Sequence, residues 1–124
     1  MSEIKNFKDL NAWQESRKLV LLIYGITKIF PPEEKFGLVS QMRRAIISIS
    51  SNIAEGFSRG TIKDKVQFYL ISKGSNTELE NQLIVSLDLK YIDADTFKLA
   101  EKQIDTVSRV LAGLIKSAMP RQVY

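Results

Sequence analysis

Residues 40–59, SQMRRAIISISSNIAEGFSR, carry two opposed stripes at the spacing of an α-helix. One stripe is apolar, and its residues recur three or four positions apart, so that they share one side of a helix. The other stripe is polar and lies about 200° away around the helix axis. A helix with two such sides packs the apolar one against a protein core. The apolar stripe comprises Met42, Ile46, Ile49, Ile53 and Phe57, and the polar stripe comprises Arg44, Ser48, Ser51, Glu55 and Arg59, with Asn52 beside it.

The polar stripe has three open interpretations. It can be a solvated helix face, or a surface on which Ser, Asn and Arg contact phosphates or another macromolecule. It can also be a polar seam between two closely packed helices, in which polar groups satisfy one another. In that case we expect Arg43 or Arg44 to pair with Glu78 or Glu80, which would fix register more than it adds stability. The expected seam comprises Arg44, Ser48, Asn52, Glu55, Glu78 and Glu80.

Turn signals divide the chain into four helices, at about residues 9–29, 34–59, 62–90 and 94–118. The Pro-Pro pair at 31–32 ends the first helix, because proline disfavours helix at the residue before it and has no backbone N–H to donate. No alternating strand pattern competes with the helical periodicity. The sequence therefore predicts an all-α protein.

Capping residues support these boundaries. Asp9, Thr61 and Asp93 are the expected N-caps of the first, third and fourth helices. Gly60 is the expected stop of the second helix. The fourth helix also has apolar residues at alternating steps of three and four, which is a heptad seam. These residues are Phe97, Ala100, Ile104, Val107, Leu111, Leu114 and Ala118.

The middle of the third helix is rich in small and polar residues. Ser72, Gly74 and Ser75 are poor helix formers, so we expect a close backbone approach there. Glu78 and Glu80 stand two positions apart and point to different sides of a helix. They are therefore not a ready-made pair of catalytic carboxylates.

The connections between the expected helices are short, which implies antiparallel neighbours. An up-down-up-down four-helix bundle is the natural architecture. The length of 124 residues suits one domain with one core, so we expect residues 1–124 to form a single bundle domain.

The composition argues against an enzyme. The chain has no Cys and no His, so the usual thiol and imidazole nucleophiles and bases are missing. The main ligands of zinc sites and the Glu-x-x-His pairs of di-metal bundles are missing too. Serines without a base are not nucleophiles. We therefore expect no catalytic residue, no metal and no cofactor, and no small-molecule substrate is evident.

The net charge of +4 is mildly basic and is spread along the chain without a lysine run. Nucleic-acid affinity needs clustered phosphate contacts, which a symmetric assembly can build by repetition. The densest basic spot is the junction of the second and third helices, where Asp64 interrupts it. A solvated turn is the competing interpretation. The candidate nucleic-acid-binding residues are Arg59, Lys63, Lys65 and Arg43.

The run LVLLIYGI at 19–26 is apolar nearly all round its helix. A bundle of this size should leave each helix one wet face, and surplus apolar surface is typical of an interface. A closed cyclic homo-oligomer would cover that surface. No apolar run reaches the ~18 residues of a membrane span, and the N-terminus has no apolar signal region. Together with the lack of Cys, this suggests a cytoplasmic protein without a membrane role.

Several motifs together resemble the small bacterial four-helix-bundle proteins encoded in intervening sequences of 23S ribosomal RNA genes. NIAEG at 52–56, after QMRRA at 41–45, is the most specific of them, and the similarity extends from Asp9 to about Ile115. The sequence departs from the family pattern at Lys90, where the family tends to have glycine, and at Ser72, where it tends to have alanine. Further matching stretches are FGL at 36–38, FYL at 68–70, GS at 74–75, ELE at 78–80 and GLI at 113–115.

This resemblance implies an antiparallel four-helix bundle and, since family members look like rings of five identical subunits, a homopentamer. It implies no known enzymatic activity. A related branch serves as an accessory to retroelement reverse transcriptases and looks like a nucleic-acid binder. The expectation is thus a non-enzymatic, homo-oligomeric bundle that binds ribosomal RNA, other RNA or DNA, or a nucleoprotein partner. The alternative is a protein-interaction scaffold with no nucleic-acid role.

Overall fold

The computed structural model describes residues 4–119, and within this range every regular element is a helix. The all-α class is therefore confirmed for the described residues. The rest of the predicted domain, residues 1–3 and 120–124, lies outside that range. Two 3-10 helices, η1 (Phe7–Asp9) and η2 (Pro32–Glu34), precede the first two α-helices. The α-helices are α1 (Asn11–Thr27), α2 (Leu38–Ser58), α3 (Ile62–Asp88) and α4 (Ala94–Ala118).

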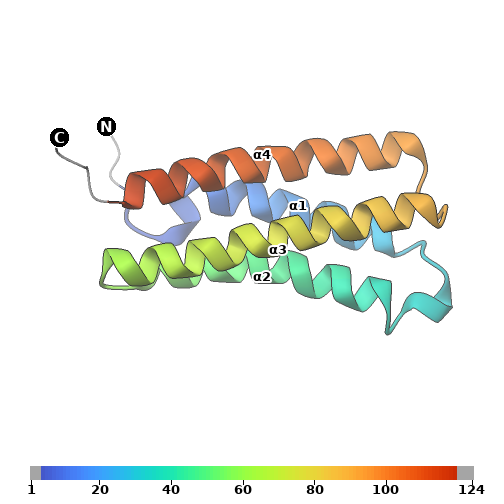
Figure 1. Cartoon of the computed structure of the whole chain (residues 1–124), viewed down its shortest axis with the longest axis horizontal. Coiled ribbons are helices and arrows are strands. Elements are labelled where there is room, and N and C mark those ends of the chain that lie inside the picture. The colour runs from blue at the N-terminus through green and yellow to red at the C-terminus, as the bar shows by residue number, and fades with distance from the viewer. Residues whose placement is uncertain (1–3, 120–124) are drawn as a thin grey trace.

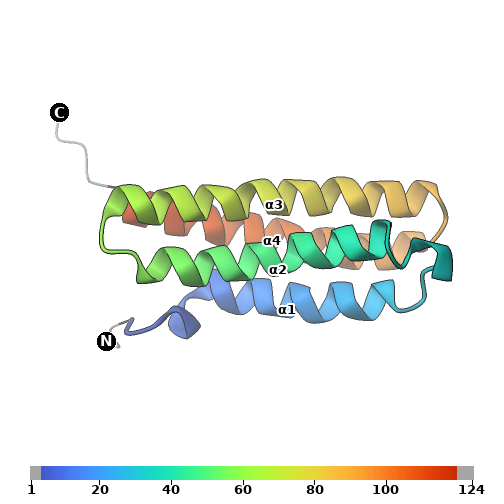
Figure 2. The same cartoon turned by 90° about the horizontal axis from the view of Figure 1, so that it is seen from below.

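The four α-helices lie side by side along the long axis of the molecule (Figure 1). In the described part of the chain, α1 and α3 each pack against α2 and α4, whereas the diagonal pairs do not meet. The α1–α2 and α3–α4 connections lie at one end, and the α2–α3 connection lies at the other, beside the start of α1 and the end of α4. Figure 2 shows α2 between α1 and α3 from below. This is a four-helix bundle.

The core is formed by the apolar sides that the sequence predicts. Met42, Ile46, Ile49 and Ile53 of α2 are fully buried, and Phe57 packs partly buried against the core. On α4, the centre of the heptad seam is buried as well. Burial stabilises the fold by about 1.5–3 kcal/mol for each large aliphatic side chain. The buried seam residues are Ala100, Ile104, Val107 and Leu111.

The N-caps of α3 and α4 are confirmed. The amide of Asp64 donates to Thr61 Oγ1 at 3.2 Å, and the amide of Thr96 donates to Asp93 Oδ1 at 2.7 Å. Each cap satisfies one of the N–H groups that a helix start leaves without a partner. The second bond lowers the pKa of Asp93, because it favours the charged carboxylate.

Two other predicted helix ends are wrong. Asp9 does not cap α1; it closes η1 in a capping box with Asn6, and α1 starts only after Leu10. Gly60 does not end α2 in a left-handed turn. The helix ends because Arg59 adopts an extended backbone, with φ −72° and ψ 149°.

The start of α2 is later than predicted because the Pro-Pro pair leads into η2 rather than into a continuous helix. Glu34, at the end of η2, accepts a hydrogen bond from the Leu38 amide at 3.1 Å through Oε1. Its other oxygen accepts a bond from the Tyr91 hydroxyl at 2.8 Å. Glu34 thus caps α2 from four residues before it and ties the α1–α2 connection to the α3–α4 connection.

The end of α3 has a left-handed residue. Lys90 has φ 64°, the one positive value at a non-glycine residue in the described chain. The Tyr91 amide donates to the Ser86 carbonyl at 2.9 Å, and the Lys90 amide donates to the Leu87 carbonyl at 3.0 Å. This is the bond pattern of a Schellman motif, which favours glycine at the left-handed position. Lys90 therefore occupies a strained position.

The predicted close approach of α3 to α2 is found at Ser72, whose buried hydroxyl donates to the Ile49 carbonyl at 2.9 Å, but it does not involve Gly74. A Cβ at Gly74 would meet nothing within 4 Å, so α3 does not need glycine there for packing within the chain. Gly56 of α2, in contrast, faces the Tyr69 ring, and an added Cβ would lie 2.7 Å from Tyr69 Cε1. A second tight contact between α2 and α3 is therefore at Gly56.

Exposed apolar side chains gather on α3 rather than on α1. The run 19–26 exposes only Leu21 strongly among its large apolar residues, because the others are buried or half-buried. The surplus apolar surface predicted for the first helix is therefore mostly a property of the third. The exposed large apolar residues of α3 are Ile62, Leu70, Ile71, Ile84 and Val85.

Candidate nucleic-acid interface

Two of the predicted basic residues at the α2–α3 junction already have partners within the chain. Arg59 pairs with Glu55 at 2.7 Å, and its guanidinium lies over the Phe68 ring at 4.5 Å. Lys65 Nζ donates to the Phe57 carbonyl near the end of α2 and lies 5.1 Å from the Phe57 ring centre. A lysine in that place satisfies a carbonyl that the helix leaves open.

Lys63 is the remaining cation of the junction. It is exposed, and within residues 4–119 it has no ion-pair partner. Asp64 follows it and is exposed as well. The junction therefore offers one unpaired cation next to one anion, which is a weak site for a polyanion.

Arg43 lies away from the junction. Its Nε donates to Thr27 Oγ1 at 3.0 Å, its Nη2 donates to the Tyr24 carbonyl at 3.3 Å, and its guanidinium lies 4.5 Å from the centre of the Tyr24 ring. It joins α2 to α1. At a rise of about 1.5 Å per residue, Arg43 stands roughly 24 Å along α2 from Arg59. The structure does not bring the four predicted residues together.

The predicted ion pairs between α2 and α3 are wrong. Arg44 donates to Gln41 Oε1 at 2.6 Å, on its own helix. Glu78 accepts a bond from Gln82 at 3.3 Å, also on its own helix. For the described residues, neither Arg43 nor Arg44 lies within ion-pair distance of Glu78 or Glu80. Arg44, Glu55 and Glu78 are exposed, so they belong to the outer surface of the bundle.

A polar seam does exist between α2 and α3, but neutral groups form it. The hydroxyls of Ser48 and Ser75 are 2.9 Å apart, and Asn52 Nδ2 donates to the Ser48 carbonyl at 2.8 Å. The Ser72 hydroxyl donates to the Ile49 carbonyl at 2.9 Å and is fully buried. The seam uses serines because they let the helices approach and still satisfy their own hydroxyls.

A basic stripe that the sequence-based prediction missed runs along α4. Its four cations follow one another at steps of four, seven and seven residues, so they share the outward side of the helix. All are exposed. Arg109 lies 3.7 Å from Asp105, whereas the three lysines have no ion-pair partner among residues 4–119. We call Lys98, Lys102, Arg109 and Lys116 the α4 basic stripe.

The α4 basic stripe was detectable in the sequence. Charge counted by segment hides it, because Asp95, Glu101 and Asp105 on the same helix nearly cancel the total. At roughly 100° per residue, Glu101 lies about 60° from Lys98 on the side away from Lys102. Asp105 and Asp95 flank the stripe, about 20° from Lys98 and Lys102 respectively. A helical projection of the charges, rather than a count, would have found the stripe.

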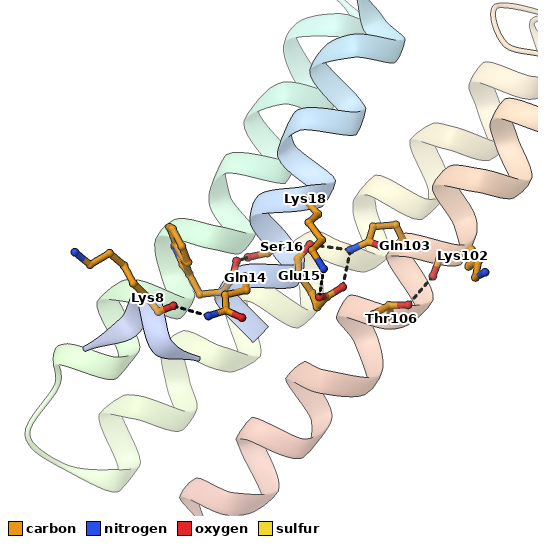
Figure 3. Close-up of polar contacts among 9 residues, drawn as sticks. Lys8, Gln14, Glu15, Ser16, Lys18, Lys102, Gln103 and Thr106 are labelled. Carbon is orange, nitrogen blue, oxygen red and sulfur yellow. Dashed lines mark hydrogen bonds and ion pairs between the residues drawn. The ribbon is translucent and has the colours of Figure 1, made fainter. Parts of the chain in front are cut away.

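Beside the stripe, α1 and α4 are joined by polar contacts (Figure 3). Gln103 Nε2 donates to the Glu15 carbonyl at 2.9 Å and to Glu15 Oε1 at 3.2 Å. Lys18 Nζ donates to Glu15 Oε2 at 2.8 Å. The bonds from Lys18 and Gln103 lower the pKa of Glu15, because they favour its charged form.

Two further features of the described residues bear on the kind of site. They contain no group of three or more Asp and Glu side chains placed to hold a metal ion. None of their helices is long and apolar enough to cross a membrane.

The fold and the surfaces define a four-helix-bundle protein in which the outward side of one helix, α4, is basic. Residues 8–113 match the family model described as 23S rRNA-intervening sequence protein. The chain belongs to that family, which confirms the resemblance seen in the sequence.

One solved structure shows the same fold. It is a protein with unknown function from the S23 ribosomal protein family of Bacteroides thetaiotaomicron, with a TM-score of 0.78. The two chains are 20% identical over 85% of this chain and 98% of that chain. No curated protein matches this chain. Similarity at this identity supports the bundle architecture.

Proposed function

We propose that the protein is a non-enzymatic, homo-oligomeric bundle of antiparallel helices that binds nucleic acid through the α4 basic stripe. The observation that carries this proposal is the set of three exposed lysines on α4 without ion-pair partners in the described chain. When exposed, unpaired cations along one helix face contact phosphates, they displace the counterions condensed on the nucleic acid. This counterion release is the main source of sequence-independent affinity. RNA, including ribosomal RNA, and DNA share this phosphate chemistry.

The α4 basic stripe replaces the α2–α3 junction as the phosphate-contacting surface. At the junction, Arg59 and Lys65 already have partners, so binding a phosphate there would first break protein contacts. On α4, Lys98, Lys102 and Lys116 need no such exchange. The nucleic-acid role therefore moves from the junction to the outward side of α4.

Self-association is supported by the exposed apolar residues of α3. Five large apolar side chains on one helix leave more apolar surface than a single bundle needs to expose. A cyclic homo-oligomer covers such a surface and repeats the basic stripe around its axis. Five copies are the number that the family resemblance implies. The connections at alternate ends of the bundle support the antiparallel, up-down-up-down order.

The non-enzymatic part of the proposal is supported by the residue types present. Without His or Cys, general base and nucleophilic chemistry lack their usual groups. The absence of Cys is also in keeping with a cytoplasmic protein.

A protein-interaction scaffold is the second candidate, and the apolar face of α3 favours it. The exposed charges of α3 nearly cancel, with Lys63 and Lys73 against Asp64, Glu78 and Asp88. A partner protein of similar character could dock there in place of a second copy. In that case nucleic acid would not bind.

One experiment separates the two candidates. The mass of the purified protein in solution is measured, together with its affinity for a ribosomal RNA fragment and for random-sequence duplex DNA at several salt concentrations. We expect an oligomer whose affinity falls steeply with salt. A clean oligomer that retains neither nucleic acid at low salt would refute the nucleic-acid role and leave the scaffold.

A further inference from the structure

A hollow of about 350 Å³ opens between α1 and α4, next to the α4 basic stripe. Leu22 and Leu99 supply its apolar walls, and Lys18 and Lys102 bring a cation from each helix. Lys102 is also a member of the stripe, so the hollow and the stripe form one continuous surface. The remaining lining residues are Gln103 and Thr106.

Two polar side chains of the hollow, Gln103 and Thr106, are held by hydrogen bonds within the chain. Gln103 is held by two bonds from its Nε2 to Glu15, which orients the amide and leaves Oε1 without a donor among the described residues (Figure 3). Thr106 donates its hydroxyl to the Lys102 carbonyl at 3.1 Å. The carboxylate of Glu15 is paired with Lys18, which reduces its repulsion of an anion but occupies Lys18. Lys102 is the lining lysine that has no ion-pair partner among residues 4–119.

This combination matches a ligand with a flat apolar part, a hydrogen-bond donor and a phosphate. A phosphate alone would not use the leucine walls, and a purely apolar ligand would not use Lys102. An orienting amide acceptor suits an exocyclic amine or ring N–H, because amide side chains recognise base edges in this way. A nucleotide has all three features.

We infer that the α1–α4 hollow takes one unpaired nucleotide of a bound strand, with its base against Leu22 and Leu99 and its phosphate near Lys102. The inference rests on the proposed function and deepens it, because it names single-stranded or looped nucleic acid as the preferred class. A base inside a duplex is stacked and cannot enter the hollow without being extruded.

The test compares an RNA hairpin with a blunt duplex of the same stem sequence. Leu99→Ser removes one wall of the hollow, and Leu21→Ser is the matched control, because Leu21 is similarly exposed (69% against 58% for Leu99) and does not line the hollow. We expect Leu99→Ser to weaken hairpin binding at least fivefold and to leave duplex binding unchanged. Leu21→Ser should change neither.

A second measurement asks whether the base is recognised. Methyl resonances of Leu22 and Leu99 are followed by NMR during titration with the hairpin, with uridine monophosphate and with ribose 5-phosphate. Shifts with the hairpin alone support a strand-borne nucleotide, and additional shifts with uridine monophosphate extend the site to free nucleotides. Equal shifts with ribose 5-phosphate would overturn base recognition.

The two proposals fail in different ways. If wild-type protein and Leu99→Ser bind hairpin and duplex equally, the hollow plays no part and the inference is overturned, while the proposed function stands. If the wild-type protein binds neither nucleic acid, both are overturned.

Discussion

Single residues determine the connections between the helices of this bundle, and one of them, Lys90, has a strained backbone conformation. It adopts φ 64° at the end of α3, where the Schellman bonds require a left-handed residue. Only glycine enters that region without a steric penalty. Gly56 is the opposite case, since the nearby Tyr69 ring leaves no room for a side chain.

Lys90→Gly should stabilise the protein by about 0.5–1 kcal/mol, because it removes the left-handed strain while the Schellman bonds stay. Urea unfolding followed by circular dichroism measures the change. Lys98→Gly, within α4, is the control and should destabilise by about 1 kcal/mol, since glycine is unfavourable inside a helix. Equal destabilisation by both substitutions would contradict the account of Lys90.

Gly56→Ala should destabilise the fold by about 1–3 kcal/mol, because the added methyl group would overlap the ring of the buried Tyr69. The same substitution at Gly74, where space is open, should stabilise by up to about 1 kcal/mol through helix propensity. Thermal and urea unfolding of both variants give the comparison. A neutral Gly56→Ala would mean that Tyr69 moves aside freely.

At the scale of the elements, the sequence predicted which residues face the core but not which polar groups meet. Helical spacing alone places Ile46 and Ile49 on one side of α2, and a helix at a core buries that side. Whether Arg44 meets Glu78 depends on how α2 and α3 are rotated relative to each other, and the spacing of residues along one helix does not determine that rotation. The same missing rotation hid the Ser48–Ser75 contact.

The seam between α2 and α3 can be tested by two double-mutant cycles. Ser48→Ala and Ser75→Ala should show a coupling of about 0.5–1.5 kcal/mol in unfolding free energy, since their hydroxyls form a partly buried hydrogen bond. Arg44→Ala and Glu78→Ala should be additive, because their side chains bond on separate helices. A measured coupling between Arg44 and Glu78 would instead support the ion pair that the sequence predicts.

The Glu34 cap should make stability depend on pH. The bonds from the Leu38 amide and the Tyr91 hydroxyl lower the pKa of Glu34 below its ordinary value of 4.5. The unfolded chain therefore takes up a proton at this residue before the folded protein does. The stabilisation is present above the unfolded pKa and is lost as pH falls through the folded pKa.

Glu34→Gln should thus lower stability at neutral pH and flatten the loss of stability between neutral and acid pH. Urea unfolding at a series of pH values from 7 to 3 measures both effects. Some acid sensitivity should remain, since the pKa values of Glu15 and Asp93 are lowered too. Tyr91→Phe is the matched variant, and it should keep part of the dependence because the Leu38 bond stays. An unchanged pH profile in Glu34→Gln would contradict the cap.

At the scale of the whole molecule, charge and apolar surface are separated between helices. The outward side of α4 is basic, and α3 exposes apolar residues with balanced charge. The fold class and the family were accessible from the sequence, because periodicity, turn signals and the NIAEG motif are local patterns. The α4 basic stripe was missed because charge was counted by segment instead of being projected around the helix axis.

The most direct measurement of the central claim compares two triple variants with the same loss of charge. Lys98→Gln, Lys102→Gln and Lys116→Gln together remove the unpaired cations of α4. Arg59→Gln, Lys63→Gln and Lys65→Gln together remove three cations of the junction. Affinity for random-sequence duplex DNA is measured from low to physiological salt, after circular dichroism has shown both variants to be folded.

The α4 variant should bind at least tenfold more weakly than the wild type at low salt. Its plot of log affinity against log salt should be shallower by roughly 0.9 for each phosphate that the variant no longer neutralises. The junction variant should stay within about threefold of the wild type, since the total charge is equal and only its place differs. Loss of binding in the junction variant, with the α4 variant unaffected, would contradict the assignment of the interface to α4.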